Sequence, residues 1–188
     1  RERRSLYPST GSGQRSTSRL ATPRLRLGAG VTVLRKDTDM KAIVQDRYGS
    51  PDVLRLTEVE KPAPGESEVL IRVHAMSLNG SDWEGLRGSP LYARLDGLRE
   101  PKHKILGTDI AGRVEEVGRN VKQFQPGDEV FGEMAGYRGG FAEYACTDES
   151  LLARKPASLT FEQAAAIPQG GVIALQGIRD KGQVQPGQ

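Results

Sequence analysis

Side chains that could bind a metal or act as a nucleophile are scarce in this sequence. Its 188 residues include one cysteine, Cys146, and two histidines, His74 and His103. A structural zinc site with four cysteines is therefore impossible, and each histidine is expected to be structural or exposed to solvent. Cys146 cannot form an internal disulfide, which suits a reducing cytosol and predicts a cytoplasmic location. It lies in a strand-like stretch beside no obvious base, as an inert, half-buried thiol would.

Polar side chains that could contact a ligand lie in three places. Asn79 and Asp82 follow one apolar run, Thr108 and Asp109 follow another, and Tyr92 lies in the long loop 88–104 between them. Long loops in compact domains often face the substrate. The Asn79 amide can both donate and accept hydrogen bonds, and Asp82 opens a short helical turn in which it is expected to be the N-cap.

The pattern of apolar and polar residues predicts a mainly β fold with short helices that would position these side chains. A capping box at Thr160 and Gln163 predicts a helix over residues 161–167. Trp83, in a short helical turn over 82–87, could pack in the core or line a cleft. Residues 168–171 interrupt the pattern before a second helix over 172–181. Strands are expected at 41–45, 54–59, 68–75, 129–132 and 142–147.

Glycines punctuate the segment from Ile105 to Ala145. A glycine inside a strand pattern marks a bulge or a barrel corner, so this segment predicts a small, strongly bent β-barrel. Pro126 and Gly127 suit the two central positions of a tight turn. The glycines of the segment are Gly107, Gly112, Gly118, Gly127, Gly132, Gly139 and Gly140.

Three motifs of this segment, taken in order, point to one protein family. They are AGRVEEVG at 111–118, PGDEVFG at 126–132 and GFAEY at 140–144. The series strongly resembles the N-terminal, GroES-like domain of medium-chain dehydrogenases and reductases. The resemblance implies a GroES-like catalytic-side domain over residues 40–168 and a linker helix over 169–188 that leads to a Rossmann nucleotide-binding domain. No G-x-G-x-x-G motif occurs in the sequence, so that domain is expected to be missing from this chain.

The resemblance is strongest to the zinc-independent branch of this superfamily. Zinc alcohol dehydrogenases supply metal ligands from a Cys and a His at the positions of Asn79 and Thr108, which leaves Asp82 and Asp109 as the only donors here, too few for zinc. In quinone oxidoreductases and related enone or enoyl reductases, an Asn followed three residues later by an Asp is usual. This branch implies hydride transfer from NADPH to a quinone or conjugated carbonyl, with no zinc.

The resemblance also implies roles for three residues. Asn79 and Asp82 are the expected cofactor-binding residues, with Asn79 orienting the nicotinamide ribose or carboxamide. A structural strand-end amide and a helix N-cap are the competing interpretations. Tyr92 is the candidate proton donor, although a lone loop tyrosine is more often a surface or packing residue. Ile173 stands where related enzymes commonly have a threonine near the nicotinamide, and it cannot donate that hydrogen bond.

Charge is unevenly distributed along the sequence. Residues 1–39 carry nine Lys/Arg and three Asp/Glu, whereas residues 40–188 carry eighteen and twenty-one, so a basic tail precedes an acidic body. The body therefore offers no basic groove for nucleic acid, and no apolar run is long enough to span a membrane. The tail is expected to be disordered, and it could be upstream translated sequence, a transit-like presequence or a basic arm.

The partners implied are a small quinone or enone and, for the parent enzyme, a second copy in a homodimer. Two alternatives stay open. The chain could be a relative of the zinc-type alcohol dehydrogenases, or an inactive truncated β-barrel module.

Overall fold

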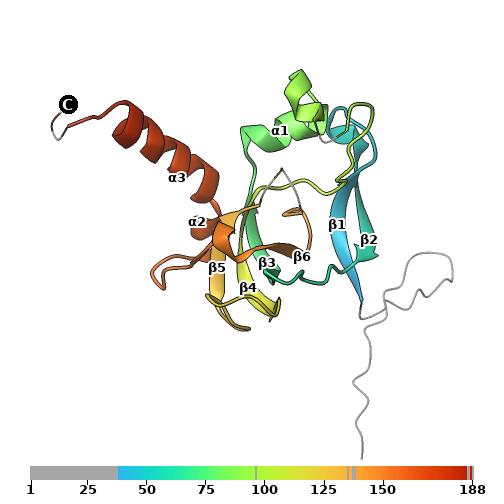
Figure 1. Ribbon diagram of the computed structural model, residues 1–188. Helices are drawn as coiled ribbons and strands as arrows, with labels where there is room; N and C mark the ends of the chain where they lie inside the picture. Colours follow the sequence, from blue (N-terminus) through green and yellow to red (C-terminus); the bar gives the residue numbers. More distant parts are fainter. Residues whose placement is uncertain (1–37, 96, 135, 137–138, 186, 188) are drawn as a thin grey trace, which may run out of the picture. The chain divides into compact units, whose positions relative to one another are not determined.

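The computed structural model describes residues 38–95, 97–134, 136, 139–185 and 187, and Thr38–Gln188 forms one compact unit. Strands dominate it (Figure 1). They are β1 (Asp39–Gln45), β2 (Leu54–Glu60), β3 (Glu68–Ser77), β4 (Asp109–Val117), β5 (Glu129–Glu133), β6 (Tyr144–Asp148) and β7 (Leu152–Arg154). The helices are α1 (Gly80–Arg87), α2 (Phe161–Ala165) and α3 (Pro168–Leu175), with 3-10 turns η1 (Pro51–Val53), η2 (Leu91–Arg94) and η3 (Glu149–Leu151) and a π-helical segment η4 (Gln176–Lys181). The basic tail, apart from its last two residues, lies outside the described residues.

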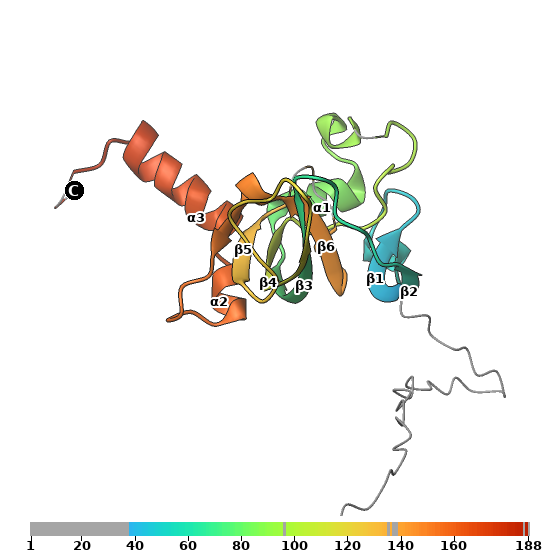
Figure 2. The ribbon, with the colours of Figure 1, turned by 60° about the horizontal axis from the view of Figure 1, so that its bottom comes forward.

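The strands form two antiparallel sheets. Five strands pair in the order β6-β3-β4-β5-β7, and β1 pairs with β2. Isolated bridges from Ala42 to Ala142 and from Val44 to Ile105 tie β1 to the rest of the unit, and Figures 1 and 2 show β1 and β2 beside β6. The predicted mainly β fold with short helices is confirmed. Among the described strands, however, β6 and β7 remain edges, so backbone hydrogen bonds do not close the expected barrel.

Glycines allow this sheet to bend and turn as the sequence indicates. A Cβ at Gly112 would lie 2.2 Å from the carbonyl oxygen of Arg72, and the β3–β4 register shifts beside it, between Val73 and Ala75. Only glycine permits such a close approach of two strands. Gly127 has a φ of 96°, and the N–H of Asp128 donates to the carbonyl of Gln125, which confirms the tight turn before β5.

The core lies on the inner face of the five-stranded sheet. Val69, Ile71, Ile110, Val114 and Val130 are each at most 2% exposed and form its centre. Burial of each such side chain stabilises the fold by roughly 1.5–3 kcal/mol. A second cluster of Leu86, Leu106 and Phe141 packs α1 against the loop before β4, and a third packs α2 on β4 through Ala111, Ala164 and Ala165.

The bounds of the two C-terminal helices differ from the sequence expectation. Helix α2 ends two residues earlier than expected, and α3 begins four residues earlier. The capping box of Thr160 and Gln163 is present, and α2 ends at Ala165. The expectation that residues 168–171 interrupt the helical pattern was wrong, because Pro168 is the first residue of α3. Proline at that position needs no N–H partner and has the φ of a helix, so it starts a helix as readily as it ends one.

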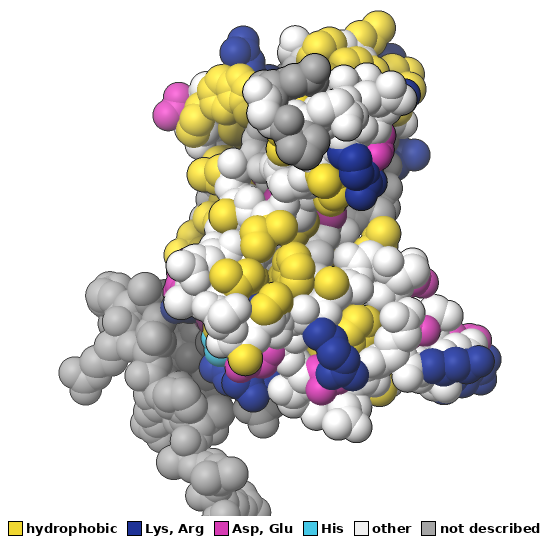
Figure 3. All heavy atoms as spheres, turned by 90° about the vertical axis from the view of Figure 1, so that its left-hand side faces the viewer, with side chains coloured by type: hydrophobic (Ala, Val, Ile, Leu, Met, Phe, Trp, Pro, Cys, Tyr) yellow, Lys and Arg dark blue, Asp and Glu magenta, His cyan; other side chains and the backbone are white. Residues whose placement is uncertain are grey.

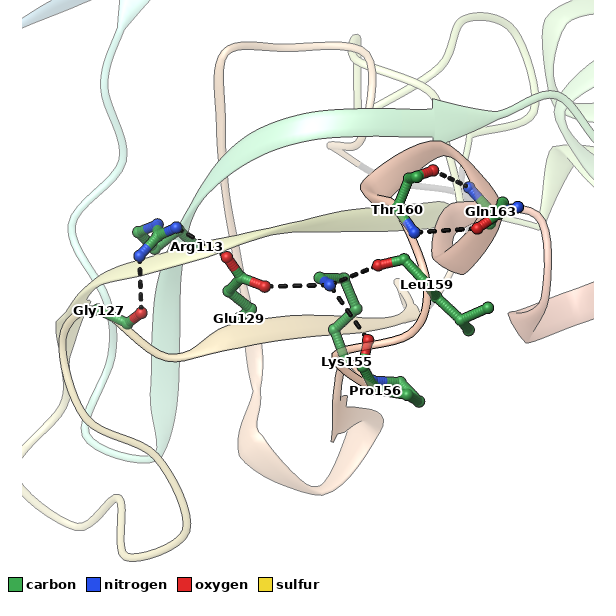
Figure 4. Close-up of polar contacts among 8 residues, drawn as sticks. All are labelled: Arg113, Gly127, Glu129, Lys155, Pro156, Leu159, Thr160 and Gln163. Atoms are coloured by element: carbon green, nitrogen blue, oxygen red, sulfur yellow. Dashed lines mark hydrogen bonds and ion pairs between the residues drawn. The ribbon is translucent and has the colours of Figure 1, made fainter.

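A buried lysine holds α2 to the sheet (Figure 4). The ammonium of Lys155, just after β7, pairs with Glu129 Oε2 at 3.0 Å and donates to the carbonyl oxygens of Leu159 at 2.6 Å and Pro156 at 3.2 Å. Its side chain is 5% exposed. Because Leu159 directly precedes the N-cap of α2, this network fixes where that helix begins.

Among the described residues, the structure contains no helix with the length and hydrophobicity needed to cross a bilayer.

Candidate functional site

The candidate site lies at the start of α1, which begins shortly after the end of β3. Asn79 is the N-cap of this helix and has extended backbone angles, and Asp82 is three residues further on. The two residues form a capping box in which the N–H of Asn79 donates to Asp82 Oδ2 at 2.8 Å. The prediction that Asp82 is the N-cap was therefore wrong. Asn79 has the extended backbone angles typical of an N-cap and directly precedes Gly80, the first residue of α1, so it holds that position.

The amide of Asn79 joins the two polar segments that the sequence singled out. Its Nδ2 donates to Thr108 Oγ1 at 3.2 Å and to Ser77 Oγ at 3.4 Å. Thr108 is 1% exposed and directly precedes β4. The end of β3 and the start of β4 are thus linked by side chains, and Asn79 lies at their junction.

Two buried carboxyl groups lie beside this junction. Asp82 is 3% exposed and Asp109, the first residue of β4, is fully buried. Asp109 Oδ2 accepts hydrogen bonds from the N–H of Gln169 at 3.0 Å and from Ser77 Oγ at 3.4 Å. Within the described part of the chain, Oδ1 of each aspartate is buried without a hydrogen-bond partner. Such atoms are costly to leave unpaired, and this concentration of them marks the cluster as more than packing.

Burial and a neighbouring charge shift the pKa of Asp82. Burial raises the pKa of its carboxyl above the ordinary value of 3.8, and the charge of Asp109 adds to this shift. Hydrogen bonds from backbone amides, that of Asn79 foremost, oppose it. Asp82 therefore gains a proton more readily than an exposed aspartate does.

Gln169 completes the cluster from the first turn of α3. Its side-chain Oε1 accepts a hydrogen bond from Ser81 Oγ at 3.0 Å, and its Nε2 donates to Glu133 Oε1 at 3.2 Å. Together with the bond from its N–H to Asp109, Gln169 contacts α1, β4 and β5. The sequence analysis included Gln169 only among residues 168–171, which were expected to interrupt the helical pattern, and did not place it in the site.

Tyr92 lies on η2, in the loop after α1. Its side chain is about half exposed, and its hydroxyl donates to Glu84 Oε2 at 2.5 Å. The structure thus attaches the candidate proton donor to α1 at Glu84, two residues beyond Asp82. Trp83 is 49% exposed, and the guanidinium of Arg87 lies 5.3 Å from its ring centroid, so the expectation of core packing was wrong and the side chain is half open to solvent.

The remaining candidate residues have structural surroundings. His74 stacks on Phe161, with ring centroids 4.4 Å apart, and His103 is exposed. Burial raises the pKa of the Cys146 thiol to about 12, which disfavours the nucleophilic thiolate at neutral pH. Across the described residues, no group of three or more His, Cys, Asp or Glu side chains is arranged to hold a metal ion.

The sequence also matches a known protein family. Residues 65–157 match the family described as the alcohol dehydrogenase GroES-like domain. The chain belongs to the medium-chain dehydrogenase/reductase superfamily. This finding confirms the resemblance to the GroES-like domain that the glycine motifs carry, and the relatives that the chain matches include quinone oxidoreductases.

Two curated relatives and one solved structure illustrate the match. The chain is 35% identical over 139 residues to the chloroplastic quinone-oxidoreductase QR1 of Triphysaria versicolor, covering 72% of this chain and 40% of that protein. It is 36% identical over 153 residues to 2-methylene-furan-3-one reductase of Solanum lycopersicum, covering 77% and 38%. The quinone oxidoreductase of Coxiella burnetii superposes with a TM-score of 0.72 at 35% identity, covering 79% of this chain and 47% of that one. The chain therefore spans less than half the length of these relatives.

Proposed function

We propose that this medium-chain dehydrogenase/reductase chain is the substrate-side part of an NADPH-dependent, zinc-independent oxidoreductase that reduces a quinone, an enone or a similarly activated carbonyl. The observation that carries the proposal is the contact between the Asn79 amide and the buried Thr108 hydroxyl. An amide and a hydroxyl replace thiolate and imidazole donors at this junction. Two of the matched relatives, a quinone oxidoreductase and a 2-methylene-furan-3-one reductase, support the same acceptor class.

The donor chemistry of the cluster fits zinc poorly. Its members offer two carboxyl groups, one amide and hydroxyl groups, and the described residues bring neither a thiol nor an imidazole to them. Zinc in proteins is held mainly by thiolate and imidazole, with about three protein ligands at a catalytic site. Without a metal, negative charge that develops on the substrate oxygen must be met by hydrogen bonds or solvent, which favours activated acceptors.

The residues of this chain fit only one end of a nicotinamide cofactor. NADPH supplies the hydride when bound. Asp82 and Asp109 would repel its phosphates, so the cluster suits the uncharged nicotinamide and its ribose. Asn79 can take part if the longer of its two bonds, to Ser77 at 3.4 Å, is exchanged for a ligand carbonyl. We assign Asn79 and Asp82 to this end of the cofactor and Tyr92 to proton donation, for which its hydroxyl must leave Glu84.

The apolar surface of α3 supports a following nucleotide-binding domain. Figure 3 faces the side on which α3 lies and shows hydrophobic side chains gathered there. Val172, Ile173, Leu175 and Ile178 are between 47% and 62% exposed. We therefore propose that residues 40–168 are the catalytic-side domain and that residues 169–188 lead into the cofactor domain. A homodimer and a cytoplasmic location are part of the same proposal.

Metal content and turnover test the proposal together. Protein carrying its full natural sequence should oxidise NADPH with quinones or enones at an unchanged rate after chelation, and should contain much less than one zinc per chain. Stoichiometric zinc, with activity lost on chelation, would support the zinc-type alternative instead. No turnover with any acceptor, together with stable folding of residues 40–188, would support the inactive module.

A further inference from the structure

The side chain of Gln169 bridges two elements at the point where α3 begins. Its Oε1 accepts from Ser81 on α1 and its Nε2 donates to Glu133 at the end of β5. We propose that this Gln169 bridge is a positioning device that fixes the direction in which α3 leaves the candidate site. We define the Gln169 bridge as these two side-chain hydrogen bonds.

The rest of α3 offers little other attachment. Pro168 is the only buried residue of this fully described helix. The N-cap, Ile167, provides no side-chain hydrogen bond, and the helix is followed by the exposed segment η4. Anchoring thus rests on the first turn, through the Gln169 N–H on Asp109 and the Gln169 bridge.

The residues that follow make such an anchor necessary. Gly170 and Gly171 come directly after Gln169. Glycine has the largest backbone freedom of any residue and weakens a helix by about 0.5–1 kcal/mol relative to alanine. A Cβ at Gly170 would meet no atom within 4 Å, so packing does not demand glycine there. Without the bridge, the start of α3 would be a flexible joint.

A carboxamide suits this place because its two ends differ. Gln169 accepts from a hydroxyl on one side and donates to a carboxylate on the other. Leucine can do neither, and a glutamate would face Glu133 with like charge. The bridge can, however, be rebuilt with its polarity reversed if Glu133 becomes the amide and Gln169 the carboxylate.

The functional consequence rests on the proposed function. Ser81 lies between Asn79 and Asp82. The bridge therefore connects the segment that holds the candidate cofactor-binding residues to α3 and to the domain that we propose follows it. A shift of about 1 Å between reacting groups can cost on the order of 100-fold in rate. Gln169 would therefore act on turnover through the position of α3, without touching the substrate.

Hydrogen exchange on the 188-residue chain tests the bridge independently of any activity. We expect Gln169→Leu and Gln169→Glu to speed exchange of the α3 backbone amides about tenfold, and the pair Gln169→Glu with Glu133→Gln to return it to within about threefold of the unchanged chain. Gln125→Leu, at an exposed glutamine, is the matched control and should leave α3 unchanged. Unaltered exchange in Gln169→Leu would overturn the bridge.

Kinetics on protein with its full natural sequence test the functional part. We expect Gln169→Leu to lower kcat with an activated acceptor by about 10- to 100-fold with a smaller change in KM for NADPH, and the double variant to recover most of it. Altered exchange with unaltered kcat would refute the positioning role and leave the proposed function intact. Altered exchange in a protein that turns over no acceptor, even unchanged, would refute the proposed function and leave the bridge.

Discussion

At the scale of single residues, the buried carboxyl groups dominate the candidate site. Asp82 and Asp109 are nearly inaccessible, and each has one oxygen without a partner among the described residues. The Ser77 hydroxyl donates to Asp109 Oδ2, and the backbone N–H of Asn79 donates to Asp82 Oδ2, so both of these donors are uncharged groups. Burying carboxyl oxygens without hydrogen-bond partners lowers the stability of the fold. Such a local cost is typical of functional sites.

The raised pKa of Asp82 has a consequence for stability that can be measured. Because burial raises its pKa above 3.8 in the folded state, the folded state holds this proton more tightly than the unfolded state. The favourable contribution is complete below pH 3.8 and is lost as the pH rises through the folded-state pKa. Asp82→Asn removes this dependence and keeps an acceptor for the Asn79 N–H. We expect its free energy of unfolding, relative to the unchanged chain, to improve as the pH rises from about 4 to 7, as followed by urea titration.

Asp148 gives a control of opposite sign. Its hydrogen bonds from the Ser150 hydroxyl and backbone lower its pKa below 3.8, so its contribution is present above that pH and is lost as the pH falls. Asp148→Asn should lose stability relative to the unchanged chain as the pH rises. The same trend in both variants would contradict the assignment for Asp82.

At the scale of elements, the sequence predicted what depends on neighbours along the chain. The five expected strands, the turn at Gly127 and the capping box at Thr160 follow from local patterns and agree with the structure, whereas β4 and β7 were not predicted as strands. The contacts of Gln169 with Ser81 and Asp109 cross 88 and 60 positions of the chain. No local periodicity encodes such contacts. Pro168 was misplaced because proline starts and stops helices by the same geometry, and only packing decides between them.

Lys155 offers a test of how α2 is attached to the sheet. Its buried ammonium pairs with Glu129 and donates to two carbonyl oxygens just before α2 (Figure 4). Lys155→Met keeps the apolar stem and removes the charge. We expect it to lower the free energy of unfolding by about 1–3 kcal/mol, because the hydrogen bonds and the ion pair of a charged group that is itself 5% exposed are lost. Lys122→Met, at an exposed lysine, should change it by less than about 0.5 kcal/mol. Equal effects in chemical denaturation would refute a special role for Lys155.

At the scale of the whole molecule, the chain combines a packed core with an apolar helix open to solvent. The core clusters bury β3, β4 and α2, whereas α3 and η4 expose Leu175 and Ile178. Exposed apolar surface of this kind usually marks an interface. The matched relatives are more than twice as long as the aligned segment, which supports the proposal that a further domain covers this surface.

Substitutions on α3 and η4 should act in opposite directions in the two forms of the protein. In the 188-residue chain, replacing Leu175 and Ile178 by Glu should reduce self-association, because it removes exposed apolar area. In protein with the full natural sequence, the same pair should lower the thermal midpoint by several degrees, since a buried interface would receive two unpaired charges. Sedimentation velocity and thermal scans measure the two effects. Leu56→Glu, at an exposed leucine of β2, is the control and should not show this reversal. A stabilising or neutral effect in the full protein would mean that no domain covers this face of α3.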